Sequence, residues 1–524
     1  MKEPRFLANT IDMKNIVALL LIAVGCLAGC KTVQPIGDES SNPDVVTFKI
    51  IQLNDVYEIA PLSGGLYGGM ARVAHVRDSV SKVNPNTFLV IAGDFLNPSL
   101  LGTIKVDGER VRGKQMVEVM NAMNFDLATF GNHEFDIGEE ALQKRLNESN
   151  FQWTSANVYQ VDEDGKRPFV IQRDIGNIPV KDSHILYVSD KNGSQIKLGF
   201  FSVTTPTNPV DFVYYGDIYS EGERAYNSLK DRVDVVIGLT HLTLDEDKEL
   251  ARRLPNLDFI MGGHEHNNML VPTNNAIIAK ADANAKTVYI HTLSFNKKSG
   301  KLKIDSHLMP IDDKTASNMR VKAIVDKWNE LLDEKIKEVI AEPDEVIYSS
   351  EIPLDGTDSA NRGIQTNLGD ILSAAMANAF DTPVDAAVVN GGSIRIDDML
   401  PNKVTSIDIF RVLPFGGEVI KVNLTGSLLI QTLDFGKLKS GTGAYLQRHN
   451  IAESASGGWL INGKPIDANN NYTIAMTDFL LKGLDIPFLT NENEGVLNVY
   501  KPKKTEAASD IRKAVILYLK SQSK

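Results

Sequence analysis

The chain has 524 residues, of which 43% are hydrophobic and 23% are charged, and its formal net charge is −12 at pH 7. This length allows several domains with well-buried cores. The acidic balance and the lack of a long basic stretch argue against nucleic acid as a structural partner. They are compatible with a small anionic substrate in a local cationic pocket.

The N-terminus has the pattern of an export signal. Lys14 precedes the apolar run 16–24, which is too short to span a membrane, and small residues lead to Cys30. The ending Leu-Ala-Gly-Cys resembles the bacterial lipobox, which implies removal of residues 1–29 and a lipid on Cys30. We therefore expect an exported protein that is anchored to the bacterial cell envelope, in the periplasm or at the cell surface. The alternative is a buried apolar helix, which the polar linker 30–44 disfavours.

Apolar runs alternate with helical patterns from residue 45 onward. The predicted strands span 45–53, 87–92, 126–130, 196–203, 233–239 and 257–262. Helices are predicted at 70–83 and 114–123. Continuous apolar runs such as FLVIAG are typical of strands that are covered on both faces. This alternation predicts an α/β domain with a buried sheet over residues 45–316.

Residues 317–340 give the clearest helical pattern in the chain. Their apolar side chains fall on one stripe, charged residues fill the opposite face, and Pro343 follows to end the helix. We expect a linker helix and a domain boundary within 317–345. A second α/β domain is expected to follow over residues 346–524.

Polar residues of metal-binding type follow five of the predicted strands. A single histidine after a strand is more often a satisfied polar residue than a ligand, but five such positions in one structural context favour a shared site. In open α/β sheets ligands gather at the carboxyl ends of strands, so these side chains are expected to converge. Aspartate, asparagine and histidine suit Zn²⁺, Mn²⁺, Co²⁺ or Fe²⁺. The residues are Asp55, Asp94, Asn132, His133, His241, His264 and His266.

The same residues carry a family resemblance. Asp-x-Tyr, Gly-Asp, Gly-Asn-His-Glu, Thr-His and Gly-His-x-His, in this order, resemble the calcineurin-like metallophosphatases, and GNHEFDIG at 131–138 is similar to the bacterial and animal 5′-nucleotidases. NRGIQTNLGD, NGGSIR, VLPFGG and YTIAMTDFLLKGLD resemble the substrate domain of those enzymes. The resemblance covers about residues 45–515. It implies an N-terminal calcineurin-like metallophosphatase α/β sandwich and a C-terminal 5′-nucleotidase-type α/β substrate domain.

The resemblance implies a two-metal hydrolase. In that family a metal-bound hydroxide attacks phosphorus, and a histidine that is oriented by an aspartate stabilises the developing charge. Carried over, these catalytic roles fall to His133 and Asp136. Asp94 would bridge the two ions, of which one would bind Asp55 and His266. The other ion would bind Asn132, His241 and His264.

The resemblance also implies a nucleotide pocket in the second half. Arginines would hold the phosphate, aromatic rings would stack on the base, and polar side chains would bond the base edge and the ribose. The phosphate-binding residues would be Arg362 and Arg395, and the stacking residues would be Phe415 and Phe479. The base-edge residue would be Asn390, and the ribose-binding residue would be Asp485. Because the metals and this pocket sit on different domains in the family, domain closure is implied, with the helix at 317–340 as the hinge.

Two departures from the family pattern stand out. Tyr57 occupies a position where most of these enzymes carry histidine, and a neutral phenol is a poor metal ligand. Its membership of the metal site is left open. Leu484 and Ile486 are bulky where the family has small residues beside the ribose, so we expect them to reshape the pocket.

The sequence therefore favours an enzyme that hydrolyses nucleoside 5′-monophosphates or related nucleotide esters outside the cytoplasm. Its partner would be a small-molecule nucleotide rather than a nucleic acid. One alternative keeps the metals and changes the ester, as in a 2′,3′-cyclic phosphodiesterase or a nucleotide-sugar pyrophosphatase. Another is a lipoprotein that binds nucleotides without turnover, with Tyr57 as the mark of a lost activity.

Overall fold

The structure is a computed structural model that describes residues 42–523, apart from 164, 190–192, 194, 208, 274, 341 and 456. Asp44–Lys524 form one compact unit. The predicted signal at 1–29, Cys30 and most of the predicted linker lie outside the described residues. Within the described part of the chain, no helix combines the length and the apolar character that crossing a membrane requires.

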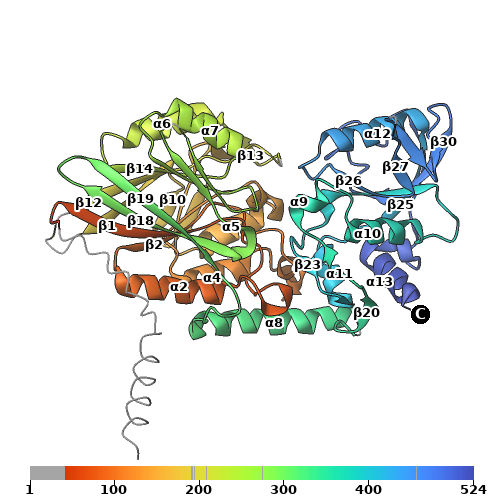
Figure 1. The fold of residues 1–524 in the computed structure, drawn as a ribbon, viewed down its shortest axis with the longest axis horizontal. Coiled ribbons are helices and arrows are strands. Elements are labelled where there is room, and N and C mark those ends of the chain that lie inside the picture. Colours follow the sequence, from red (N-terminus) through yellow and green to blue (C-terminus); the bar gives the residue numbers. More distant parts are fainter. Residues whose placement is uncertain are drawn as a thin grey trace, which may run out of the picture. The chain divides into compact units, whose positions relative to one another are not determined.

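Two six-stranded sheets build the first half of this unit (Figure 1). The first has the order β19-β18-β1-β2-β5-β6, in which β1, β2, β5 and β6 run parallel. The second has the order β11-β12-β14-β15-β17-β16, with β12, β14, β15 and β17 parallel. The bounds are β1 Val45–Leu53, β2 Thr87–Ile91, β5 Leu127–Thr129, β6 Gln152–Thr154, β11 Ser183–Ser189, β12 Gln195–Phe201, β14 Val235–Thr240, β15 Phe259–Gly262, β16 Met269–Pro272, β17 Ile277–Lys280, β18 Thr287–Asn296 and β19 Lys301–Pro310.

The two sheets pack face to face with helices outside them. Because side chains alternate along a strand, β1 sends Ile50 into the core shared with Phe200 and Phe259 of the second sheet, and Ile51 into the core under the helices. The layers are therefore helix, sheet, sheet, helix. The covering helices are α2 Met70–Val83, α4 Lys114–Met123 and α5 Glu139–Glu148 on one side, and α6 Ile218–Leu229 and α7 Leu244–Arg253 on the other.

The long helix α8 (Met319–Val339) follows the first half and packs on it. It lies beside α2 and α4 (Figure 1). Its apolar stripe joins the core that these two helices cover. Trp328 is buried in that contact, and its indole N–H donates a hydrogen bond of 2.9 Å to Glu118 Oε2 on α4. The stripe that the sequence pattern indicates is thus the packing face of the helix.

A five-stranded sheet forms the centre of the second half, in the order β26-β22-β30-β25-β31. Apolar residues of α10, α11 and α13 pack on one face of it, and α12 packs on the other. The bounds are β22 Ala386–Asn390, β25 Val419–Thr425, β26 Leu446–His449, β30 Asn471–Thr477, β31 Val496–Tyr500, α9 Asp358–Asn361, α10 Asn367–Ala377, α11 Ser406–Val412, α12 Gly426–Leu438 and α13 Ile511–Gln522.

The predicted α/β class is confirmed, and most predicted elements lie close to their observed bounds. The helices expected at 70–83 and 114–123 have those bounds, and the expected strands agree within two residues at either end. Short exposed strands such as β8 (Gly165–Arg167) had no prediction, because they bury too little apolar surface to show a pattern.

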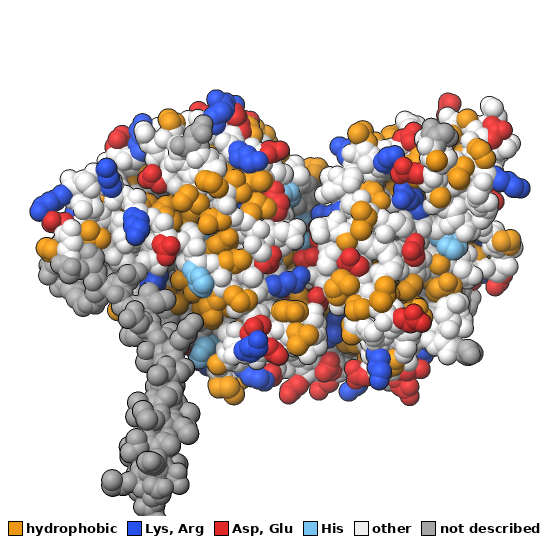
Figure 2. Space-filling view, viewed as in Figure 1, with side chains coloured by type: hydrophobic (Ala, Val, Ile, Leu, Met, Phe, Trp, Pro, Cys, Tyr) orange, Lys and Arg blue, Asp and Glu red, His pale blue; other side chains and the backbone are white. Residues whose placement is uncertain are grey.

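Cationic and anionic side chains are interspersed over the face shown in Figure 2.

Candidate metal and substrate site

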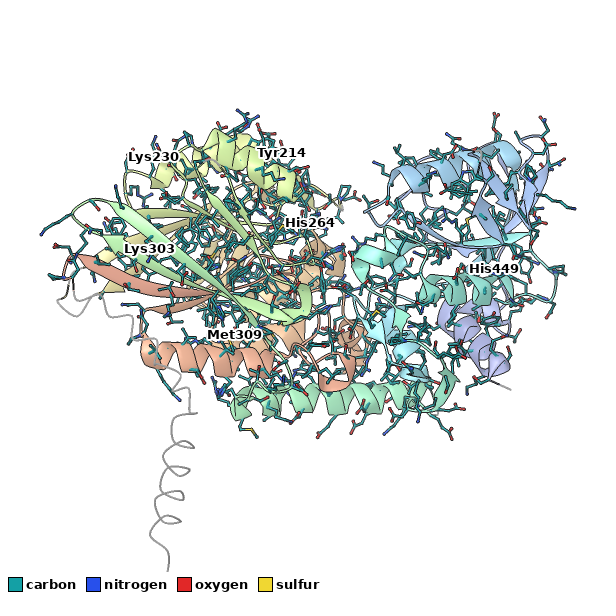
Figure 3. The ribbon with its side chains drawn as sticks, in the orientation of Figure 1. Tyr214, Lys230, His264, Lys303, Met309 and His449 are labelled. Atoms are coloured by element: carbon teal, nitrogen blue, oxygen red, sulfur yellow. The ribbon has the colours of Figure 1, made fainter. Side chains whose placement is uncertain are left out.

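The metal-binding residues that follow separate strands come together at one edge of the first half. Asp55 follows β1, Asp94 follows β2 and His241 follows β14. One ligand atom from each of these three side chains lies within 4.8 Å of the others, and all three residues are buried. His264, which Figure 3 labels, follows β15 at the same edge. The carboxyl ends of these parallel strands thus lie at the same edge, next to one another.

The loops that carry these residues turn sharply. Asp55, Asp94 and His264 adopt left-handed backbone conformations with φ of 53°, 55° and 81°, which non-glycine residues rarely do and which cluster at functional sites. Gly131 has no room for a side chain, because a Cβ there would lie 2.1 Å from Asp94 Oδ1. The Gly131 backbone can therefore approach the Asp94 carboxylate closely, as only glycine allows.

Asp94 contacts both His133 and His241. Its Oδ1 accepts a hydrogen bond of 2.8 Å from the His133 backbone N–H, and its Oδ2 lies 3.2 Å from His241 Nε2. Burial acts to raise the pKa of Asp94, but the positive charges on His241 and His133 outweigh it and hold this pKa below its ordinary range. Asp94 is therefore a buried carboxylate that stays charged, as a bridging ligand needs to be.

His241 presents one ring nitrogen to the site. Its Nδ1 lies 2.8 Å from the carbonyl oxygen of Ala92, so in the neutral ring Nδ1–H donates to that carbonyl and the Nε2 lone pair faces Asn132 Oδ1 at 3.1 Å. Asn132 Oδ1 also lies 3.2 Å from His264 Nδ1. Burial acts to lower the pKa of His241, but Asp94 and Asp55 raise it to about 10. The carboxylates thus attract a cation.

Tyr57 lies inside the site. Its hydroxyl is 3.3 Å from Asp55 Oδ1, 3.4 Å from Asp94 Oδ2 and 3.1 Å from His266 Nε2. Burial, and then the charges of Asp94 and Asp55, raise the pKa of Tyr57 well above its ordinary value, so the phenol is neutral in the metal-free protein. These contacts place the Tyr57 hydroxyl among the candidate metal ligands, a position that the sequence alone leaves open.

His266 is contacted by carboxylates from the second half of the chain. Its Nδ1 lies 3.3 Å from Asp397 Oδ2 and 3.7 Å from Asp358 Oδ2, while its Nε2 faces Asp55 Oδ1 at 3.6 Å. Sequence reasoning missed both partners. Asp397 follows Arg395 by two residues, but no pattern in the sequence pairs it with a histidine 131 positions earlier.

The predicted catalytic pair is assembled. His133 Nδ1 lies 2.6 Å from Asp136 Oδ2, one turn further along the 3₁₀ segment His133–Ile137. Between them stands Glu134, which sequence reasoning left without a role. Its buried carboxylate accepts hydrogen bonds from the backbone N–H groups of Gly131, Asp94, Phe95 and Leu96, at 2.5 to 3.1 Å. Glu134 therefore holds the loop after β2 against the loop after β5.

The two predicted phosphate-binding arginines lie close to the metal site. Burial, and then the charge of nearby Arg362, lower the pKa of Arg395, while Asp136 and Asp358 oppose that shift. Arg395 Nε is buried and has no hydrogen-bond partner among the residues that the structure describes. Arg362 Nε forms an ion pair of 2.8 Å with Asp358 Oδ1. The guanidinium groups are thus placed where an anion would relieve their mutual repulsion.

The predicted base-stacking residues lie on neighbouring loops. Phe415 is 52% exposed, and the Arg395 guanidinium lies 5.6 Å from the centre of its ring. Phe479 is half-buried. The Asp478 backbone N–H donates a hydrogen bond of 3.0 Å to the Glu418 carbonyl, which ties the two loops together. An open aromatic face is therefore available on the loop that reaches toward the arginines.

The predicted ribose and base-edge residues bond to each other. Asn390 Nδ2 donates a hydrogen bond of 2.7 Å to Asp485 Oδ2, and Asn390 Oδ1 accepts one of 2.6 Å from the Ser393 hydroxyl. In this arrangement Asn390 positions Asp485. The expectation that Ile486 reshapes the pocket is wrong, because this side chain is wholly buried in the core that α12 covers. Leu484 is 67% exposed, so the expectation that it reshapes the pocket stays a prediction.

Comparisons with known proteins agree with this geometry. Residues 48–268 match the calcineurin-like phosphoesterase family, and residues 346–490 match the 5′-nucleotidase C-terminal domain family. The chain is 28% identical to human 5′-nucleotidase over 418 residues, which cover 72% of this chain and 68% of that protein. It is 26% identical to the trifunctional nucleotide phosphoesterase protein YfkN of Bacillus subtilis over 510 residues, which cover 86% of this chain and 33% of that protein.

The chain thus spans about a third of the Bacillus relative. Among solved structures, the 5′-nucleotidase precursor from Thermus thermophilus superposes with a TM-score of 0.73 at 21% identity, covering 91% of this chain and 97% of that one. The Staphylococcus aureus protein described as a putative 5′-nucleotidase gives a TM-score of 0.61 at 15% identity, covering 90% and 96%. Both likenesses concern the fold, which extends over both halves of the chain.

Proposed function

Because the chain belongs to the 5′-nucleotidase family of calcineurin-like phosphoesterases, we propose that this metallophosphoesterase hydrolyses nucleoside 5′-monophosphates or related nucleotide esters. One observation carries the proposal. Asp55 of the buried Asp55–Asp94–His241 cluster lies 3.6 Å from His266 Nε2, and the other nitrogen of that ring lies 3.7 Å from Asp358, the carboxylate that pairs with Arg362 at 2.8 Å. A metal centre and an anion-binding group thus share one site.

We assign the site to two divalent ions, drawn from Zn, Mn, Co and Fe. The described donors fit such ions, since buried carboxylate and amide oxygens and imidazole nitrogens converge there. When bound, the ions supply Lewis-acid chemistry that polarises a phosphate ester and acidifies water. The proposed ligands are Asp55, Asp94, Asn132, His241, His264 and His266, with Asp94 shared.

The histidine–aspartate pair would act at the reacting group. Asp136 Oδ2 accepts from His133 Nδ1 at 2.6 Å, which orients the ring. The His133 ring would then stand beside the phosphoryl oxygens as negative charge develops on them. Arg362 and Arg395 would bind the same oxygens in fork geometry and fix the phosphate against the site.

The nucleoside would be held by the second half. Phe415 and Phe479 would stack on the base, a contact worth about 1–3 kcal/mol per base that tolerates many bases. Asp485, fixed by Asn390, would accept hydrogen bonds from the ribose hydroxyls. We also propose that the chain divides into a metallophosphatase domain at 45–316, a linker at 317–345 and a substrate domain at 346–524. Helix α8 in the linker would be the hinge.

We further propose that the enzyme acts outside the cytoplasm and is lipid-anchored through Cys30. The support is the charged, apolar and small-residue pattern of residues 14–30. A second activity on other nucleotide esters is favoured by the relation to the Bacillus protein, whose name describes a trifunctional nucleotide phosphoesterase. The formed His133–Asp136 pair argues against a binding protein without turnover.

The test identifies the products that the purified chain forms with Mn²⁺, Co²⁺ or Zn²⁺. The expected products are phosphate from AMP, a nucleoside monophosphate from a cyclic nucleotide, and a nucleoside monophosphate with a sugar 1-phosphate from a nucleotide-sugar. AMP, a 2′,3′-cyclic nucleotide and a nucleotide-sugar form the panel. We expect AMP to be hydrolysed, chelation to stop the reaction, and His133→Ala to lower kcat by a factor on the order of 10² or more. His449→Ala, on β26, is the matched control and should keep wild-type activity.

The panel separates the candidate functions. Release of a nucleoside monophosphate from the cyclic nucleotide or the nucleotide-sugar, without release of phosphate from AMP, would replace the nucleotidase by the corresponding esterase. No release from any compound, with nucleotide binding retained, would leave only the binding function.

A further inference from the structure

Lys280 is a wholly buried lysine beside the candidate metal centre, outside every motif that predicts that centre. It is the last residue of β17, and none of its surface is exposed. An ammonium group is costly to bury unless it is paired and hydrogen-bonded. Its partners therefore show what the position does.

Two of these partners hold the segment that follows β14. Lys280 Nζ donates a hydrogen bond of 2.6 Å to the carbonyl of Leu242, the residue directly after the candidate ligand His241. It also lies 2.8 Å from Asp247 Oδ2 on α7. Asp247 Oδ1 in turn accepts a hydrogen bond of 2.6 Å from the Thr240 hydroxyl, at the end of β14. The lysine thus fixes the chain on both sides of His241.

The third partner belongs to the loop after β15. The Lys280 ammonium group forms an ion pair with the carboxylate of Glu265, which stands between the candidate ligands His264 and His266. The other oxygen of that carboxylate accepts a hydrogen bond of 2.6 Å from the Leu244 backbone N–H. One cation therefore links the two loops that carry three of the imidazoles.

The packing around Lys280 leaves little freedom. A Cβ added to Gly262, at the end of β15, would lie 2.7 Å from Lys280 Cε and 2.9 Å from Asp247 Oδ2. The lysine stem therefore crosses directly over the backbone that leads into the His264 loop. Gln52 holds the other side, since its Nε2 donates to the carbonyls of Gly262 at 3.0 Å and Ala279 at 2.8 Å.

We propose that Lys280 is a positioning residue of the metal centre, which fixes the loop after β14 relative to the loop after β15 and so sets the spacing of the His241, His264 and His266 rings. The inference rests on the proposed metal centre but not on the proposed substrate. Ligand spacing controls metal affinity, and partners that orient ligands typically contribute 10–100-fold to it.

The experiment titrates the metal-free full chain with Mn²⁺ alone, by calorimetry, in the absence of substrate. Lys280→Met removes the ammonium group and keeps an unbranched side chain, and we expect it to bind Mn²⁺ about 10–100-fold more weakly than the wild type. Lys49→Met is the matched control. Lys49 is also a buried strand lysine, but it lies on β1 and bonds the Thr292 hydroxyl at 2.8 Å. We expect wild-type Mn²⁺ affinity for this control.

A second variant covers the case in which Lys280→Met does not fold. Glu265→Gln keeps an acceptor for the Leu244 N–H and removes the charge that pairs with the lysine, and we expect it to weaken Mn²⁺ binding as well. Wild-type affinity in folded Lys280→Met, or in Glu265→Gln where Lys280→Met is unfolded, would overturn the proposal. No Mn²⁺ binding by the wild-type chain would overturn the metal centre as well. Failure to hydrolyse AMP would bear only on the substrate.

Discussion

Tyr57 stands where the family resemblance leads us to expect histidine, and its hydroxyl has three ligand-type neighbours. Asp55, Asp94 and His266 all lie within 3.4 Å of that oxygen. A neutral phenol offers a divalent ion only a weak donor, whereas an imidazole nitrogen offers a strong one. Of the two ions proposed, the one assigned to Asp55 and His266 is therefore expected to bind less tightly than the one assigned to the imidazole pair His241 and His264.

Replacing Tyr57 by histidine tests this difference. We expect Tyr57→His to raise the affinity for Zn²⁺ or Mn²⁺ at one of two sites by about tenfold or more, because a nitrogen ligand replaces the phenol, without lowering the melting temperature. Metal titration of the stripped protein and thermal unfolding measure the two quantities. Tyr57→Phe is the control, since it keeps the ring and removes the oxygen. If Tyr57→His leaves both metal affinities unchanged, Tyr57 contributes no ligand atom.

At this scale the sequence predicts which candidate ligands come together better than it predicts the residues that contact them. Asp55, Asp94 and His241 each follow an apolar strand, so local pattern and strand order bring them together. Asp397, Asp358 and Lys280 act across large separations in sequence. Their contacts depend on how whole elements pack, and no local pattern records that.

Strand β18 lies between the outer strand β19 and β1, the strand that leads to Asp55. It pairs with β1 on one side and with β19 on the other. His291 on β18 is wholly buried, with Nδ1 2.8 Å from the Ser306 hydroxyl and Nε2 2.9 Å from Gln52 Oε1. Gln52 in turn bonds the backbones of β15 and β17. Burial lowers the pKa of His291 to about 3.

This element makes the fold sensitive to acid. The folded pKa of His291 lies below the unfolded value near 6.5, so protonation favours the unfolded chain, and stability that is present above pH 6.5 is lost as the pH falls toward 3. We expect the free-energy difference between wild type and His291→Gln to shrink over that range. Denaturant unfolding at several pH values measures it.

The control for this prediction is His307→Gln, on the exposed face of β19, which should follow the wild type at each pH. A constant difference between His291→Gln and wild type from pH 6.5 to 4 would show that His291 does not carry the acid response. Carboxylates elsewhere shift all three proteins alike and so cancel in the comparison.

At the scale of elements the sequence is most informative where buried positions form an uninterrupted apolar run or a helical stripe, and β18, whose buried residues alternate with polar ones, had no prediction. The helices α2 and α4 and the strand β1 are predicted to the residue, since their apolar periodicity is set by the cores they cover. Strand β19 alternates exposed and half-buried positions and had no prediction. It is held by backbone pairing to β18, which a sequence pattern does not record.

Within the unit Asp44–Lys524, the second half contacts the candidate metal centre and also carries the residues proposed to bind substrate. Asp397 faces His266 Nδ1 at 3.3 Å, and Lys286 faces Asp397 at 3.7 Å. A carboxylate on the far nitrogen of a metal-binding histidine fixes the ring and makes it a stronger donor. Metal affinity is therefore linked to the arrangement of the two halves. By reciprocity, a nucleotide that favours this arrangement also strengthens metal binding.

Asp397 and its neighbour Asp398 allow that linkage to be tested with a matched pair. Asp398 also bridges the halves, through a hydrogen bond of 2.6 Å from the Ser63 hydroxyl, but it does not contact His266 in the described structure. Asp397→Asn should weaken Mn²⁺ binding about tenfold and reduce the gain in Mn²⁺ affinity that AMP produces, measured in a His133→Ala background that prevents turnover.

Asp398→Asn should leave Mn²⁺ affinity without nucleotide at the wild-type level, because the contact between the halves that it alters is the one to Ser63. Equal Mn²⁺ affinities in the two asparagine variants would mean that the halves meet without influencing the metal. A loss in Asp397→Asn alone would mean that the second half completes the site, since the carboxylate that orients His266 reaches it only when the halves are joined as they are here.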